Sequence, residues 1–153
     1  MRFLLFLSLL VISCDKNSSG PNNSTNECID YTCWNLDSDG VLDNYHDFQF
    51  NGSITSTVMN GSQSIANSND ILGAFVNNEL RGVAITTEVP FGPYEGTYQF
   101  LMLIYSNLSS GESVQFKFYD SQNDTVYNIT QLYDFVSDMI LGDVVNPIEL
   151  YIE

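Results

Sequence analysis

Basic side chains are scarce in this chain of 153 residues, which has 4 lysines and arginines, 19 aspartates and glutamates and a formal net charge of −15. The four basic residues are Arg2, Lys16, Arg81 and Lys117. A surface with this charge repels phosphate backbones and anionic headgroups, and it attracts cations. We therefore expect no nucleic-acid partner.

The chain also has little of what nucleophilic enzymes need, because His46 is its only histidine. His46 lies in an acidic segment and no cysteine is expected to be a free thiol, so Ser-His and Cys-His systems have no base. The paired carboxylates of a glycoside hydrolase are compatible with the composition, although most acids fall at predicted turns. The sequence therefore predicts a protein that is not an enzyme, with a glycoside hydrolase as a remote alternative.

The apolar segment at the start of the chain is too short to span a membrane. It covers residues 3–12 behind the charge of Arg2, and its length of about ten residues is typical of a signal-peptide core. The segment leads into Val11-Ile12-Ser13-Cys14, which resembles the lipobox of bacterial lipoproteins, although Ile12 is a less usual residue at its position. The alternative is an ordinary secretory signal whose cleavage site falls near a cysteine.

The lipobox resemblance implies that residues 1–13 are a signal peptide and that Cys14 is lipidated as the new N-terminus. The membrane is then a partner through the lipid anchor. The resemblance implies an exported, membrane-anchored lipoprotein in the periplasm or on the cell surface, with the outer membrane favoured.

Cysteines are few, and an exported chain with three of them would leave one unpaired. If Cys14 carries lipid, Cys28 and Cys33 remain as an even pair. A disulfide between them would contribute roughly 2 kcal/mol in the loop-entropy model. A zinc site is the competing interpretation, but two cysteines and His46 supply too few tetrahedral ligands.

The domain organisation follows from composition. Residues 14–27 form a polar segment with nothing to bury, so we expect a flexible tether. Residues 28–47 hold the predicted disulfide and an acidic loop. Residues 48–153 are long enough for one domain.

The pattern beyond Phe48 is almost wholly that of strands, and no stretch has convincing helical periodicity. Residues 48–58 alternate between apolar and polar side chains. Residues 71–76 and 76–85 predict a hairpin whose turn contains Asn77 and Asn78. Residues 98–106 are nearly continuously apolar, which predicts a central strand buried on both faces. Eight or nine short strands predict an all-β fold, an antiparallel β-sandwich of immunoglobulin-like or jelly-roll type.

A loop rich in oxygen side chains occupies residues 35–47, with the sequence NLDSDGVLDNYHD. Oxygen ligands at its first, third, fifth and ninth positions and glycine at its sixth have the spacing that wraps a loop around calcium. The loop resembles the calcium loops of thrombospondin type 3 repeats and dockerins, except that His46 stands at the twelfth position in place of a carboxylate. The predicted calcium ligands are Asn35, Asp37, Asp39, the Val41 carbonyl, Asp43 and Asp47. The alternative is a solvated acidic turn.

Several segments between residues 44 and 153 resemble an all-β accessory module of exported and surface proteins of Bacteroidetes. They are NDILGAFVNNELRGVAI, YQFLMLIYSN, GESVQFKFYD, TVYNI and GDVVNPIEL. The resemblance implies a non-catalytic domain at the cell envelope, and it implies no particular ligand.

Four side chains are candidates for ligand binding. Trp34, Phe91 and Tyr94 offer rings that could stack on sugars, and Arg81 could hold an acidic ligand. The structural alternatives are that the aromatic rings pack against the end of the sandwich and that Arg81 pairs with Glu79 or Asp70. The sequence thus favours a binding or adhesion module for a polysaccharide or a protein, with a structural lipoprotein that scaffolds an envelope assembly as the alternative.

Overall fold

The structure is a computed structural model that describes residues 31–153. This part of the chain forms nine strands and two short 3-10 helices, which confirms the predicted all-β fold and number of strands. None of its helices is long and apolar enough to cross a membrane. The predicted signal peptide, the tether, Cys14 and Cys28 lie outside the described residues.

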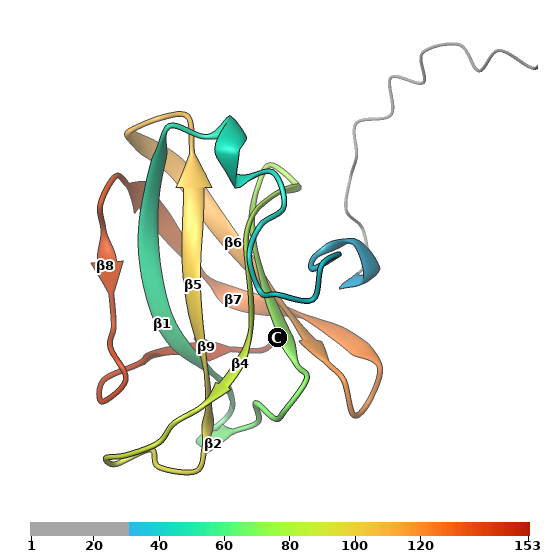
Figure 1. The fold of residues 1–153 in the computed structure, drawn as a ribbon. Helices are drawn as coiled ribbons and strands as arrows, with labels where there is room; N and C mark the ends of the chain where they lie inside the picture. The colour runs from blue at the N-terminus through green and yellow to red at the C-terminus, as the bar shows by residue number, and fades with distance from the viewer. Residues whose placement is uncertain (1–30) are drawn as a thin grey trace, which may run out of the picture.

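The elements follow one another along the chain as Figure 1 shows. The helices are η1 (Tyr31–Cys33) and η2 (Tyr45–Asp47). The strands are β1 (Phe50–Asn60), β2 (Gln63–Ser64), β3 (Ile71–Val76), β4 (Glu79–Glu88), β5 (Tyr98–Ser106), β6 (Ser110–Asp120), β7 (Thr125–Val136), β8 (Ile140–Leu141) and β9 (Ile148–Tyr151).

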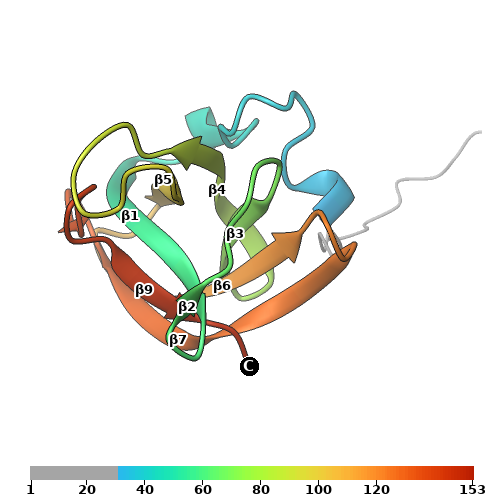
Figure 2. The ribbon, with the colours of Figure 1, turned by 90° about the horizontal axis from the view of Figure 1, so that it is seen from below.

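The strands form one curled sheet in the order β2-β1-β5-β4-β3-β6-β7. β4 turns the corner, because its first part pairs with β3 and its residues 86–88 pair with β5. β9 pairs with β1, and a bridge between Ile129 and Ile152 joins the chain end to β7, so that β9 lies between β1 and β7 (Figure 2). Whether the curl counts as an immunoglobulin-like or jelly-roll sandwich stays a prediction.

The sheet is antiparallel along its main path, as predicted, and two short strands are added to it in parallel. β8 and β9 both pair parallel with β1. The reason is that the chain leaving β7 reaches β1 near its start, where the Asp138 amide donates to the Asn51 carbonyl and the Ser53 amide donates to the Met139 carbonyl, both at 2.8 Å. From there the chain runs along β1 in the same direction.

The predicted hairpin between β3 and β4 is confirmed. Its two turn residues, Asn77 and Asn78, have φ angles of 50° and 65°. Positive φ at both central residues is the type I′ geometry that matches strand twist, and asparagine adopts it more readily than most residues. The register of the hairpin places Val76 opposite Glu79.

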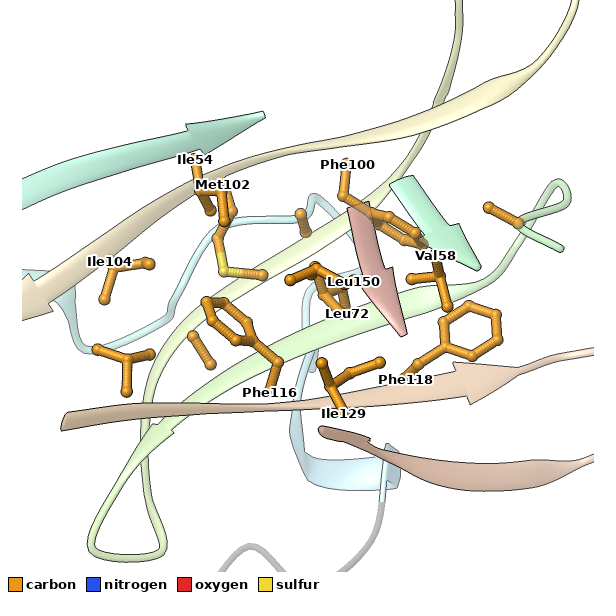
Figure 3. Close-up of a cluster of buried hydrophobic side chains, with 14 of the residues drawn as sticks. Ile54, Val58, Leu72, Phe100, Met102, Ile104, Phe116, Phe118, Ile129 and Leu150 are labelled. Carbon is orange, nitrogen blue, oxygen red and sulfur yellow. The ribbon is translucent and has the colours of Figure 1, made fainter. Parts of the chain in front are cut away.

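The main core fills the inside of the curl, where side chains from all the long strands point toward one another (Figure 3). Every second residue of a strand faces this interior, as the alternating pattern predicts. The labelled members in Figure 3 are Ile54, Val58, Leu72, Phe100, Met102, Ile104, Phe116, Phe118, Ile129 and Leu150.

The prediction that the strand at residues 98–106 is buried on both faces is wrong. Leu101 and Leu103 are 51% and 46% exposed. They lie on the outer face of β5 beside Thr55 and Ser53 of β1. No described segment covers this part of the outer face, so an apolar run here does not imply a second buried layer.

A second, smaller core lies on the outer face of β3 and β4. It consists of Trp34, Phe75 and Val83, with Trp34 only 1% exposed. Gly73 makes room for this packing, because a Cβ at that position would lie 2.8 Å from the Phe75 ring and 3.2 Å from the Trp34 ring. The segment before β1 therefore belongs to the same folded unit as the sheet.

Trp34→Ala is expected to lower the free energy of unfolding by about 3 to 5 kcal/mol, because it removes the largest side chain of the outer core. The measurement is chemical denaturation of the oxidised protein. Leu36→Ala is the control: Leu36 is 66% exposed, and we expect a change within about 0.5 kcal/mol. Equal losses for the two variants would contradict the packing described for Trp34.

Candidate functional site

The acidic loop at residues 35–47 closes on itself through its own side chains. The Asn35 Oδ1 accepts a hydrogen bond of 2.8 Å from the Gly40 amide, and the Asp39 Oδ1 accepts one of 2.8 Å from the Val41 amide. Gly40 has φ 76°, the left-handed region that favours glycine. Leu42 is buried and fastens the loop to the domain.

The carboxylates of the loop remain exposed. The pKa of Asp43 is raised, first by partial loss of hydration and then by the negative charges of Asp37 and Asp39. Asp47 lies in η2, where its main-chain carbonyl accepts a hydrogen bond of 3.2 Å from Asn107, and the neighbouring His46 ring lies 3.8 Å from that of Tyr45. Within residues 31–153, no three or more His, Cys, Asp or Glu side chains gather in a way that could hold a metal ion.

The structure corrects the role suggested for Trp34. Its ring is buried and packs edge-on to Phe75, with centroids 5.4 Å apart, so it offers no face to a sugar. Phe91 is 60% exposed and Tyr94 is half-buried. Both lie in the loop between β4 and β5, and their role in binding stays a prediction.

The structure also corrects the suggestion that Arg81 holds an acidic ligand. Arg81 is buried and its guanidinium pairs with Glu79 at 3.1 Å and with Glu112 at 3.2 Å. It also lies 4.9 Å from the Phe48 ring centroid. The protein's own groups engage both terminal nitrogens of the guanidinium, whereas its Nε is buried and has no hydrogen-bond partner among the described residues.

Of the two acids suggested as structural partners of Arg81, Glu79 pairs with it, whereas Asp70 binds the Asn67 and Ser121 amides. Glu112, which the sequence did not point to, binds Arg81 through both carboxylate oxygens. It also accepts a hydrogen bond from the hydroxyl of Ser106. These contacts join β4, β5 and β6 at one place, which is a structural role.

A polar cleft of about 320 Å³ opens where several turns meet at one end of the sheet. This is the lower end in Figure 1, where β2 and the turn between β6 and β7 lie. The lining residues are Asn60, Gln63, Ser64, Ile65, Asn67, Asp120, Gln122, Asn123, Tyr127 and Ile152. We call it the polar cleft, since most of these side chains are amides, hydroxyls or carboxylates.

Asp70 ties together the two loops that form the walls of the polar cleft. It is fully buried, and its Oδ2 accepts a hydrogen bond of 2.7 Å from the Asn67 amide. Its Oδ1 accepts hydrogen bonds from the amide and the hydroxyl of Ser121, at 2.9 and 2.8 Å. Charge-assisted bonds of this kind are stronger than neutral ones and hold the loops in fixed positions.

Asp120 organises the turn between β6 and β7 in a similar way. Its carboxylate accepts hydrogen bonds from the amides of Gln122 and Asn123 and from the Asn123 side chain, at 2.9, 3.1 and 2.7 Å.

The polar cleft was not predicted from the sequence. The signal was the clustering of Asn, Gln and Ser in two turns, but the turns are about sixty residues apart and only the sheet order brings them together.

Comparison with known proteins adds nothing to this geometry, since no family model, no curated protein and no solved structure matches the chain. The resemblances to a lipobox, to calcium loops and to an accessory module therefore stay predictions. The function has to be argued from the residues themselves.

Asp70→Ala is expected to lower the free energy of unfolding by about 3 kcal/mol, because it leaves the amides of the half-buried Asn67 and Ser121 without an acceptor. Hydrogen exchange at the Asn67 and Ser121 amides should become faster. The control is Asp134→Ala on the exposed side of β7, which should change neither quantity. Unchanged exchange at the two amides in Asp70→Ala would show that Asp70 does not hold the loops.

Proposed function

We propose that the protein is a non-catalytic, lipid-anchored protein of the cell envelope whose β domain is a binding or adhesion module for a polysaccharide or a protein. The observation that carries this proposal is the polar cleft, whose walls are fixed by Asp70 and Asp120. A fixed concave site with several polar groups is the usual form of a binding site for a small ligand or a chain segment.

The positions of the titratable groups favour binding over catalysis. η2, which contains His46, lies at the end of the domain opposite to the polar cleft (Figure 1), and the His46 ring is tilted against that of Tyr45. Asp120 is the one carboxylate that lines the cleft, and three donors already engage it. Glycoside hydrolysis needs two carboxyl groups with separate roles, and the cleft offers one.

The anchor is supported by the sequence alone, through the lipobox-like residues before Cys14 and the polar residues that follow. If residues 15–27 act as the tether that the sequence predicts, their typical span would be about 20 Å, which would hold the domain clear of lipid headgroups. Several acyl chains, at about 0.8 kcal/mol per buried methylene, would make the attachment effectively permanent.

Mass spectrometry of the mature protein from its native host is expected to find residues 1–13 removed and acyl groups on Cys14. Membrane fractionation should place the protein with the lipid phase. The matched variant is Cys14→Ala, which should be found without acyl groups and outside that phase. An unmodified thiol at Cys14 or an intact leader would refute the anchor.

We also propose that the acidic loop binds calcium. The support is the ligand spacing and the left-handed Gly40 at the sixth position. In addition, the pKa of Asp43 is raised by partial loss of hydration and, after that, by the negative charges of Asp37 and Asp39. The side chains of Asp37, Asp39 and Asp43 are exposed, so they can turn toward a common ion without disturbing any packing. An affinity of about 10⁻⁴ to 10⁻³ M is typical of extracellular calcium modules.

Calcium at 10 mM is expected to stabilise the protein by about 1.4 to 2.7 kcal/mol, the value for a ligand present at ten to a hundred times such a dissociation constant. The measurement is thermal unfolding with and without calcium. Asp37→Asn with Asp39→Asn should abolish the effect, whereas Asp134→Asn should leave it intact. Equal stabilisation of both variants would place the effect elsewhere on this acidic chain.

The second candidate function is a structural lipoprotein that scaffolds an envelope assembly, and the exposed apolar face of the sheet favours it. Ser53 of β1 lies between Leu103 of β5 and Ile140 of β8, and Ile140 is 79% exposed. Leu101, Leu103 and Ile140 thus expose apolar surface on one face of the sheet, with Ser53 between the last two. Such a surface suits a protein partner. Loss of a specific cross-link to one envelope protein in Leu101→Thr with Leu103→Thr, together with no response to any glycan, would favour this function over ligand binding.

A further inference from the structure

We infer that the polar cleft binds a short stretch of a neutral oligosaccharide, an inference that rests on the binding function proposed above and names the chemistry of its ligand. This ligand is supported by the unpaired amides at the rim of the cleft, by the polar character and charge of its lining, and by its rigidity.

Three amide side chains at the rim of the cleft are available to a ligand. Asn60, Gln63 and Gln122 are exposed, and in the part of the chain that the structure describes their side chains make no hydrogen bond. Each carboxamide offers two donors and one oxygen acceptor with two lone pairs. Each hydroxyl of a sugar ring can also donate and accept a hydrogen bond. Two neighbouring hydroxyls can therefore bind one carboxamide together, one at its oxygen and the other at its NH2 group.

The charge of the cleft selects against acidic sugars. No lysine or arginine lines it, and its one carboxylate, Asp120, is engaged by the turn it organises. The chain carries a formal net charge of −15. The negative charge of the protein would therefore repel a uronic acid or a sulfated sugar, and no basic side chain in the lining would pair with it. A neutral sugar is not repelled in this way.

The two apolar side chains in the lining leave the cleft almost wholly polar. Tyr127 and Ile152 are half-buried and pack against the main core, where the Tyr127 ring lies beside that of Phe118 with centroids 6.3 Å apart. The lining therefore offers amide, hydroxyl and carboxylate groups and little apolar surface. Such a lining suits the hydroxyl edges of a sugar rather than its C–H faces.

The cleft is rigid before any ligand arrives. Asp70 joins the loop at Asn67 to the turn at Ser121, and the Thr57 and Ser64 hydroxyls, 2.9 Å apart, hold β2 against β1. A site ordered in advance loses less conformational entropy when it binds. Its volume, about 320 Å³, is at the small end of the range for ligand pockets and suits a few ring atoms of a chain rather than a long groove.

The test is titration of the full-length protein in detergent with short neutral oligosaccharides, namely gluco-, xylo- and manno-oligosaccharides, and with oligogalacturonate of equal length. Calorimetry should find saturable binding to at least one neutral series and none to oligogalacturonate. Amide shifts in nuclear magnetic resonance spectra should change within residues 63–67 and 120–123.

Gln63→Ala with Gln122→Ala is expected to weaken that binding by about tenfold or more, since two hydrogen-bonding groups are lost. Their side chains take no part in the described internal hydrogen bonds, so the thermal midpoint should stay the same. Gln49→Ala is the matched control, an exposed amide at the opposite end of the domain.

The outcomes separate this inference from the proposed function. Saturable glycan binding that maps to Phe91 and Tyr94, preference for oligogalacturonate, or peptide binding in the cleft would each overturn the inference and leave a binding module in place. No binding to any glycan or envelope protein would overturn both.

Discussion

The pairing of the chain end with β1 and β7 positions the other parts of this domain. β9 pairs with β1, and Ile152 bridges to Ile129 of β7, so the last residues of the chain lie between the first strand and the seventh. This contact gives the sheet a single inside, and Leu150 of β9 is fully buried there. The same contact brings the turn after β1, the turn before β7 and the chain end to one rim, which is where the polar cleft opens.

Buried charge in this acidic chain is used to fix positions. Arg81 links β4 to Glu112 of β6, and Asp70 links the loop before β3 to the turn after β6. Burying a charge is costly unless it is paired, and each of these groups has a partner that lies far along the chain: Glu112 for Arg81 and Ser121 for Asp70. A buried charge of this kind contributes little net stability, but it penalises other arrangements of the same loops. At the polar cleft, other arrangements of the two loops would leave Asp70 buried and unpaired, so the walls of the cleft keep one arrangement.

Sequence reasoning worked where structure is decided locally. The alternation in β1, the bounds of β5 and the Asn77-Asn78 turn were all predicted, because strand periodicity and turn chemistry depend on adjacent residues. It failed for Leu101 and Leu103, where an apolar run was taken as a sign of burial on both faces. It failed for Trp34 as well, because an aromatic residue in a polar segment gives no indication of the sheet face on which it packs.

The all-β class, the strand spacing, the acidic surface and the hairpin turn are readable from the sequence, since each depends on composition or on residues close together in the chain. The roles of Asp70 and Trp34 and the shared cleft of amides about sixty residues apart become visible in the folded domain. The reason is that strand order and sheet curl set the distances between segments, and these are collective properties that no short window of sequence contains.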